Sequence, residues 1–190
     1  MLNPNEVETF FPVRRSLGYS PAFEIVIPPS KEAVLPFAIL TNTTAPVHVY
    51  TDGSGFENGK GASALLYIND CLSRSLHFYL GMPQENMVYK AEGVGLIMGL
   101  HLLNRLSRQL TNPTVLGTDS QAVIKSLNNQ LAHSGWYLLD TIHRATERLH
   151  EKQDGLINCT DHLQAIKADE RQKGKSKGVI DLQVHWVTSP

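Results

Sequence analysis

The chain has 190 residues, 42% of them hydrophobic and 18% charged, a composition typical of a folded globular protein and not of a disordered or fibrous one. Its 17 Lys and Arg residues against 18 Asp and Glu residues give a net charge of -1. This balance excludes a polybasic tail protein but allows a local basic patch. The length suits one ordinary domain with an extension.

The cysteine content and the apolar stretches indicate the cellular compartment that the chain is expected to occupy. Cys71 and Cys159 form neither a CxxC pair nor a disulfide framework, which favours a reducing compartment. Charged residues flank Phe10 and Phe11, so the N-terminal region is not expected to be a signal peptide. No apolar stretch reaches the roughly 20 residues of a membrane span without prolines or charges. We therefore expect an intracellular, membrane-free and monomeric chain, in either the nucleus or the cytoplasm.

Residues 1–46 are predicted to be a proline-rich connector that precedes the domain. Seven of the chain's 10 prolines lie here. Proline removes a backbone donor and disrupts helices, so this density predicts no long helix. The run 23–27 is a candidate strand. An extended arm against a neighbouring domain is the interpretation that this composition favours.

Residues 47–190 are predicted to form one α/β domain. Strands are expected over 47–51, 61–68 and 72–80, and the Asn69-Asp70 pair has the chemistry of a turn. Three strands joined by short turns indicate an antiparallel meander. Further elements are expected in the order helix 88–108, strand 114–118, helix 120–128, helix 135–152 and strand 179–187. The polar and basic segment 153–178 is predicted to be an insertion loop.

Three acidic residues occupy positions at which a carboxylate needs an explanation. Asp52 follows the predicted strand 47–51, Asp119 follows the predicted strand 114–118, and Glu92 lies in the first turn of an apolar helix. If these two strands are neighbours, the three carboxylates meet at one edge of the sheet and repel each other unless a cation joins them. Oxygen ligands suit Mg²⁺, and two such ions can activate a water and stabilise the leaving oxygen in phosphodiester cleavage.

Each of these acids also has a simpler interpretation. An aspartate after a strand is commonly a turn or N-cap residue, and Asp119 before Ser120 fits that role. A glutamate in the first turn of a helix interacts favourably with the helix dipole. From the residues alone, both interpretations stay open.

Three motifs in order resemble those of type 1 ribonuclease H. The run 47–55 resembles the family's first strand, the run 89–92 its second motif, and the run 117–121 its third. The spacings of 40 and 27 residues between the acids also suit that family. Within it, the chain looks most like the domain that follows reverse transcriptase in fungal LINE-type retrotransposons. The resemblance implies a ribonuclease H-like fold with a mixed five-stranded sheet, in which three antiparallel strands precede the parallel ones.

The resemblance further implies hydrolysis of the RNA strand of RNA/DNA hybrids. Asp52, Glu92 and Asp119 would be the catalytic ligands of two Mg²⁺ ions, with Mn²⁺ as a possible substitute. Gly53 and Ser54 would lie close to the scissile phosphate, and Gln121 would contact the minor groove of the hybrid, where 2′-hydroxyls are displayed. A reverse transcriptase domain in the same polyprotein is the implied partner.

The end of the sequence departs from the family pattern. The residues Thr188, Ser189 and Pro190 stand where the family has a histidine-bearing loop, a fourth carboxylate and a last helix. We expect the loss of one ligand to weaken the second metal most. The alternative hypothesis is therefore a catalytically impaired remnant that still binds nucleic acid.

Two groups of residues outside these motifs are weaker candidates. Lys173, Lys175 and Lys177 belong to a basic cluster that can either grip phosphates or form a solvated loop. His143, Glu147, His150 and Glu151 have spacings compatible with a metal site, but a polar helix face is the favoured interpretation.

Overall fold

The computed structural model describes residues 19–56, 59–81, 87–110, 113–128, 135–161 and 180–187. Its elements, in chain order, are β1 (Glu24–Val26), α1 (Lys31–Thr44), β2 (Val47–Phe56), β3 (Gly59–Ile68), β4 (Cys71–Gly81), α2 (Met87–Asn104), β5 (Thr114–Thr118), α3 (Gln121–Leu127), α4 (Trp136–Asp161) and β6 (Leu182–Trp186).

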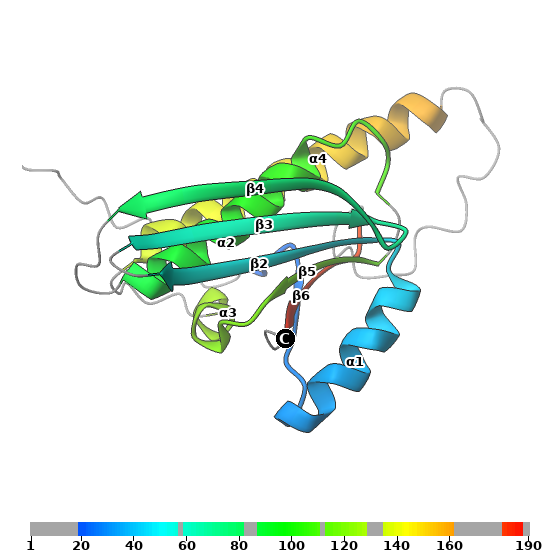
Figure 1. Cartoon of the computed structure of the whole chain (residues 1–190). Coiled ribbons are helices and arrows are strands. Elements are labelled where there is room, and N and C mark those ends of the chain that lie inside the picture. Colours follow the sequence, from blue (N-terminus) through cyan, green and yellow to red (C-terminus); the bar gives the residue numbers. More distant parts are fainter. Residues whose placement is uncertain are drawn as a thin grey trace, which may run out of the picture.

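The strands form one mixed sheet in the order β1-β6-β5-β2-β3-β4 (Figure 1). Strands β2, β3 and β4 pair antiparallel, whereas β5 is parallel to β2, β6 to β5 and β1 to β6. The fold class predicted from the sequence, three antiparallel strands followed by parallel ones with flanking helices, is confirmed. The predicted number of five strands is not, because β1 adds a sixth strand at one edge. Asn69 and Asp70 both have positive φ, as a tight hairpin turn between β3 and β4 requires.

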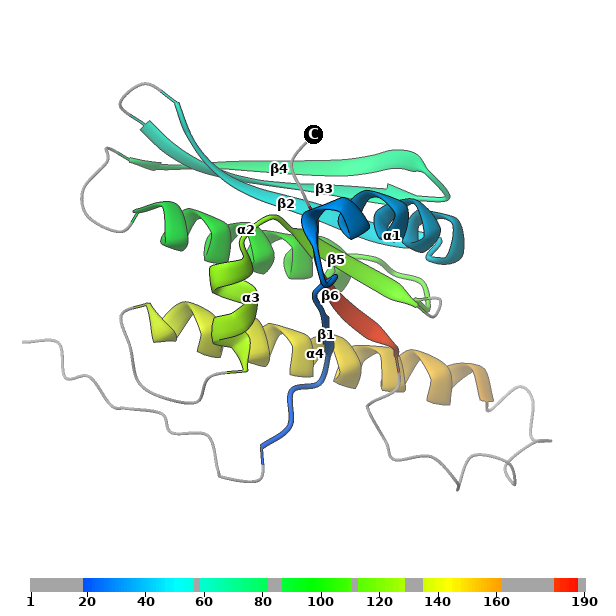
Figure 2. The ribbon, with the colours of Figure 1, turned by 90° about the horizontal axis from the view of Figure 1, so that it is seen from below.

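Helix α2 covers one face of the sheet and is itself covered by α4 (Figure 2). Alternate residues of β2 face α2, among them Val49 and Thr51, and the glycines of α2 let its backbone lie close to them. A Cβ on Gly99 would lie 3.1 Å from Val49 Cγ1 and 3.0 Å from Thr51 Cγ2. Helix α2 is therefore buried on more than one side, between the sheet and α4.

Helix α1 lies in the segment that the sequence predicted to be free of long helices, and this prediction was wrong. The 14-residue helix contains Pro36, which costs about 3 kcal/mol in a helix interior. Burial of Val34, Thr41 and Ala45 on one side of the helix offsets that cost. The other prolines of this region stand outside the helix. Two precede Ser30, whose hydroxyl accepts the N-capping hydrogen bond, and one follows the C-cap.

Helix α4 extends further than predicted and holds the N-terminal segment. The helix runs to residue 161, and Gln153 within it is fully buried, so the polar stretch that begins there does not start as a loop. Tyr19 donates a hydrogen bond to Glu147 at 3.0 Å, and the ring of Phe23 stacks on that of His143 at 5.2 Å. Nε2 of His150 donates to a carbonyl of the same segment at 2.6 Å. These histidines therefore fasten the segment before β1 to α4.

The structure also bears on the membrane prediction. None of the helices in the described ranges combines the length and the apolar character that a membrane span requires.

Candidate metal centre

Asp52 and Asp119 meet because two parallel strands are in register. Thr51 of β2 pairs with Thr118 of β5, so the residues that follow lie at the same edge of the sheet. The sequence suggested that the strand ends at Asp52, but Asp52 lies within β2. Strand β2 continues to Phe56 because β3 pairs with it on the other side. Asp119 is the first residue after β5, directly before the Ser120 N-cap of α3.

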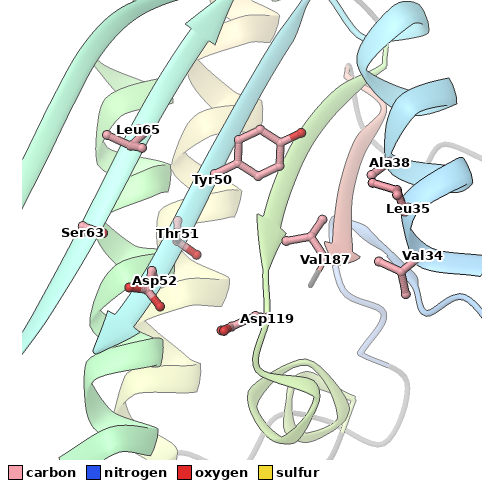
Figure 3. Close-up of a pocket in the computed structure, with 10 residues that line it drawn as sticks. All are labelled: Val34, Leu35, Ala38, Tyr50, Thr51, Asp52, Ser63, Leu65, Asp119 and Val187. Carbon is pink, nitrogen blue, oxygen red and sulfur yellow. The ribbon is translucent and has the colours of Figure 1, made fainter. Parts of the chain in front are cut away.

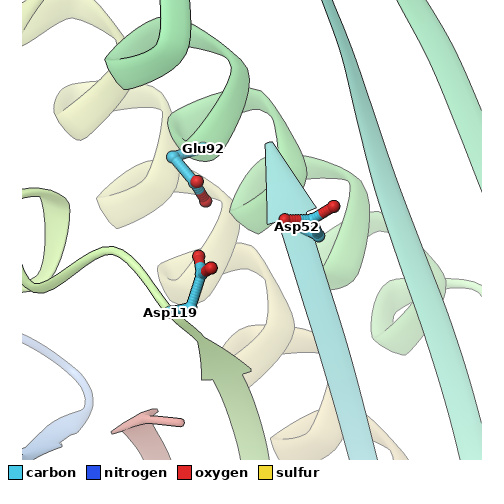
Figure 4. A group of neighbouring side chains, drawn as sticks. All are labelled: Asp52, Glu92 and Asp119. Carbon is cyan, nitrogen blue, oxygen red and sulfur yellow. The ribbon is translucent and has the colours of Figure 1, made fainter. Parts of the chain in front are cut away.

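Glu92 reaches the same edge from α2, because the helix crosses β2 in very close contact. A Cβ on Gly53 would lie only 2.3 Å from the backbone N of Glu92 and 2.6 Å from the carbonyl carbon of Ala91. Only glycine allows this approach. One oxygen from each of Asp52, Glu92 and Asp119 lies within 4.8 Å of the others (Figure 4). The structure thus brings together the three acids that the sequence singled out.

Neighbouring groups hold the three carboxylates in place. The Thr118 hydroxyl donates to Glu92 Oε2 at 3.4 Å, and the Gly53 backbone N–H also donates to that carboxyl group. The Trp186 indole N–H donates to the backbone carbonyl of Asp119 at 3.0 Å, which fixes the chain where it leaves β5. Trp186 is only 6% exposed. The Trp186 side chain is therefore part of the hydrophobic core.

The carboxylates are electrostatically unfavourable to one another. Burial and, after it, the charges of Asp119 and Asp52 together raise the pKa of Glu92 to about 8. Burial also raises the pKa of Asp52, with the charge of Asp119 as the second cause, while the Ser54 hydroxyl opposes the shift. A divalent cation among these oxygens would relieve the repulsion and favour the ionised forms. The donor set, three carboxylates with no sulfur or imidazole, fits a hard cation such as Mg²⁺.

The remaining predicted site residues fall in several places. Gly53 is buried with its backbone against α2, whereas Ser54 is exposed beyond it. Gln121 is half-buried and opens α3, next to Asp119 in sequence. Lys173, Lys175 and Lys177 lie outside the described residues.

A cavity beside the carboxylates was missed by the sequence analysis. It has a volume of about 650 Å³, with Asp52 and Asp119 on its lining. Leu35 and Ala38 of α1 face Tyr50 of β2 across it (Figure 3). Residues of α1 line the cavity, and the density of prolines in this segment had argued against any such helix. The signal that would have found it is the helical spacing of the small and apolar residues between positions 34 and 45.

The alternative metal site on α4 is not realised. Within the described ranges, no second group of three histidine, cysteine or acidic side chains approaches one another as Asp52, Glu92 and Asp119 do. The interpretation of that helix face as simply polar was also incomplete. His143 is 5% exposed and His150 8%, because the N-terminal segment covers them.

Comparison with known proteins gives matches among solved structures alone: no protein-family model and no curated protein matches the chain. The chain is similar to ribonuclease H1 of the archaeon Halobacterium salinarum, with 18% identity and a TM-score of 0.42 over 73% of this chain and 83% of that one. It is also similar to LC11 ribonuclease H1 in complex with an RNA/DNA hybrid, with 16% identity and a TM-score of 0.44 over 57% and 79%. A foamy virus ribonuclease H domain matches with 14% identity and a TM-score of 0.37 over 74% and 78%. At this level of similarity, function must be inferred from the chain's own residues.

Proposed function

We propose that this chain is a metal-dependent endonuclease that hydrolyses the RNA strand of RNA/DNA hybrids. The observation that carries the proposal is the convergence of Asp52, Glu92 and Asp119 from three separate elements within 4.8 Å. Each belongs to one of the three sequence motifs that resemble type 1 ribonuclease H. The turn and N-cap interpretations of the single acids do not explain why all three meet.

The chain's own residues would prepare the site. Asp52 and Asp119 would present oxygens from the edge of the sheet, and Glu92 would give up its proton as a cation binds. The N–H of Gly53 and the hydroxyl of Thr118 would orient the Glu92 carboxylate. Bound there, Mg²⁺ or Mn²⁺ would supply a Lewis acid that generates the attacking nucleophile and stabilises the leaving oxygen.

The finer assignments belong to the same proposal. Asp52, Glu92 and Asp119 act as catalytic metal ligands, Ser54 and Gln121 contact the substrate beside them, and Gly53 admits close backbone approach. Motif resemblance supports a retroelement origin of the LINE type, with a reverse transcriptase as the associated domain. In this proposal residues 1–46 connect the two, residues 47–190 form the nuclease, and the insertion 153–178 adds a weaker phosphate contact.

A cleavage assay tests the proposal directly. The 190-residue chain is incubated with a labelled RNA/DNA hybrid in Mg²⁺ and separately in Mn²⁺, beside Asp52→Asn and the matched control Asp154→Asn, which changes an exposed acid of α4. We expect cleavage by the unmodified chain and by the control, and none by Asp52→Asn. Mg²⁺ should also raise the melting temperature of every chain except Asp52→Asn.

The outcomes separate two functions. Equal cleavage by Asp52→Asn would show that the site assignment is wrong. A folded chain that binds the hybrid in a salt-sensitive manner, without cleavage in either metal, would support the catalytically impaired remnant instead.

A further inference from the structure

A groove lined by arginines lies on the side of the molecule that α2 and α4 form. One hollow of about 510 Å³ lies between these helices, with His101, Arg144 and Arg148 on its lining. A second, of about 470 Å³, lies between β4 and α2 and is lined by Arg74, Arg105 and again His101. Because His101 borders both, the two hollows adjoin, and we call these five residues the basic groove. Figure 2 shows α2 and α4 side by side along this part of the molecule.

The basic groove concentrates positive charge on a chain whose net charge is -1. All five of its side chains are exposed. Arg144 forms an ion pair with Asp140 at 2.8 Å, and in the described part of the chain no carboxylate lies within ion-pair distance of the other three arginines. Four arginines and one paired aspartate leave a local charge of 4 − 1 = +3 with His101 neutral. Such a potential attracts a polyanion.

The arrangement of the charges suits a linear polyanion. Arg144 and Arg148 are one helical turn apart on α4, so this helix presents two cations about 5–6 Å apart. Arg105 directly follows α2, and Arg74 lies on β4 across the second hollow. The planar guanidinium donates two parallel hydrogen bonds to phosphate oxygens, which makes arginine the residue best suited to phosphate recognition.

The basic groove is separate from the carboxylates. His101 follows Glu92 by nine residues in the same helix, which is two and a half turns. His101 therefore lies on the opposite side of α2 and about 14 Å further along its axis. A strand held in the groove would leave the cluster of Asp52, Glu92 and Asp119 free.

We propose that the basic groove is a second nucleic-acid site, which binds a single strand through its phosphates and does not require the metal centre. The site goes beyond the nuclease function, because it would act in the absence of divalent ions. A strand held on this face would stay attached to the chain whether or not the carboxylates are engaged.

Fluorescence anisotropy with a labelled single-stranded DNA tests the proposal. The whole chain is titrated in EDTA, so that a metal-dependent contribution from the carboxylates is removed, and the affinity is measured against salt concentration. The variants are Arg105→Gln and Arg148→Gln, and Arg108→Gln is the matched control, because Arg108 is an exposed arginine that lines neither hollow. Asp52→Asn reports separately on the carboxylates.

Each groove variant should lower the salt slope by about 0.7, the value for one phosphate contact on a single strand. With an unchanged affinity at 1 M salt, this loss amounts to roughly fivefold weaker binding at about 0.1 M salt, or about 25-fold for the double variant. Arg108→Gln should bind like the unmodified chain. Asp52→Asn should bind at least as well, even if hybrid cleavage fails in every metal.

Three results would overturn the proposal. The first is a lack of binding at low salt by a chain shown to be folded. The second is binding that survives the double variant but is lost in Lys173→Gln/Lys175→Gln/Lys177→Gln, which would assign it to the insertion. The third is displacement of the DNA by polyglutamate at equal charge concentration, which would identify the ligand as an acidic peptide. Circular dichroism of each variant establishes that it is folded.

Discussion

Replacement of Gly53 by alanine should damage the candidate site while leaving its three acids in place. The added Cβ would lie 2.3 Å from the backbone N of Glu92 and 2.8 Å from its Cα, whereas ordinary contact begins at 3.4 Å. Both atoms belong to the helix backbone and cannot rotate away. Strand β2 and helix α2 must therefore separate by about 3.4 − 2.3 = 1.1 Å at this point.

The magnitude follows from that displacement. Overpacking of this kind costs about 1–3 kcal/mol of folding free energy, which lowers the melting temperature by roughly 2–12 °C in a chain of this size. The same displacement moves Asp52 away from Glu92. Misplacement of catalytic groups by about 1 Å costs on the order of 100-fold in rate. We expect the affinity for Mg²⁺ to fall as well.

Thermal melting with and without Mg²⁺, followed by the hybrid cleavage assay, measures these effects. The matched control is Gly95→Ala on α2, where the new Cβ would meet Thr51, Asp52 and Ser63 at ordinary distances of 3.4–3.5 Å. That change should be neutral or stabilise the helix by up to about 1 kcal/mol. If Gly53→Ala melted and responded to Mg²⁺ like Gly95→Ala, the close contact would not position the carboxylates.

Further predictions concern single polar groups. The pKa of Glu92 is raised from 4.5 to about 8, so without metal the free energy of unfolding should fall as the pH rises through this range. Urea unfolding in EDTA at a series of pH values should show a smaller fall for Glu92→Gln than for the unmodified chain. Burial lowers the pKa of His185 from 6.5 to about 4, so the contribution of the neutral imidazole to the free energy of unfolding should be lost as the pH falls through that window. His185→Gln should weaken this pH dependence in the same urea titration. Trp186→Phe removes the hydrogen bond to the Asp119 carbonyl and should cost about 1 kcal/mol in urea unfolding, with weaker Mg²⁺ stabilisation; unchanged Mg²⁺ stabilisation would contradict a positioning role. Gln153→Leu leaves a buried backbone N–H of the loop after α2 without its acceptor at 2.8 Å and should cost about 1–3 kcal/mol, which a melting curve like that of the unmodified chain would disprove.

The strands and the acids were open to prediction because their signals are local. Alternation of apolar and polar residues marks β2 and β3. The Asn69-Asp70 pair tolerates the positive φ of the turn that joins β3 to β4. The position of Asp119 between a short apolar strand and a serine N-cap is likewise visible in the order of residues. Nothing beyond adjacent residues is needed to recognise these features.

Helix α1 shows where local signals mislead. The density of prolines argued against a helix, yet Pro36 is tolerated because Val34 and Ala45 bury their side chains in the fold. Part of the packing that offsets the cost of the proline comes from a residue more than a hundred positions away. His185 packs against Phe37 of this helix at 5.1 Å. The cavity beside the carboxylates could not be predicted for the same reason, because α1 forms part of its lining.

The sequence by itself determined the order of the strands along the chain, the turn chemistry and the three acids that end up together. Tertiary structure alone decided that β1 pairs with β6, that α1 lines a cavity beside Asp52, and that arginines from β4, from α4 and from the end of α2 line adjoining hollows. The physical reason is the range of the interactions. Backbone preferences act between neighbours in sequence, whereas burial and electrostatic repulsion act between any groups that the folded chain brings into contact.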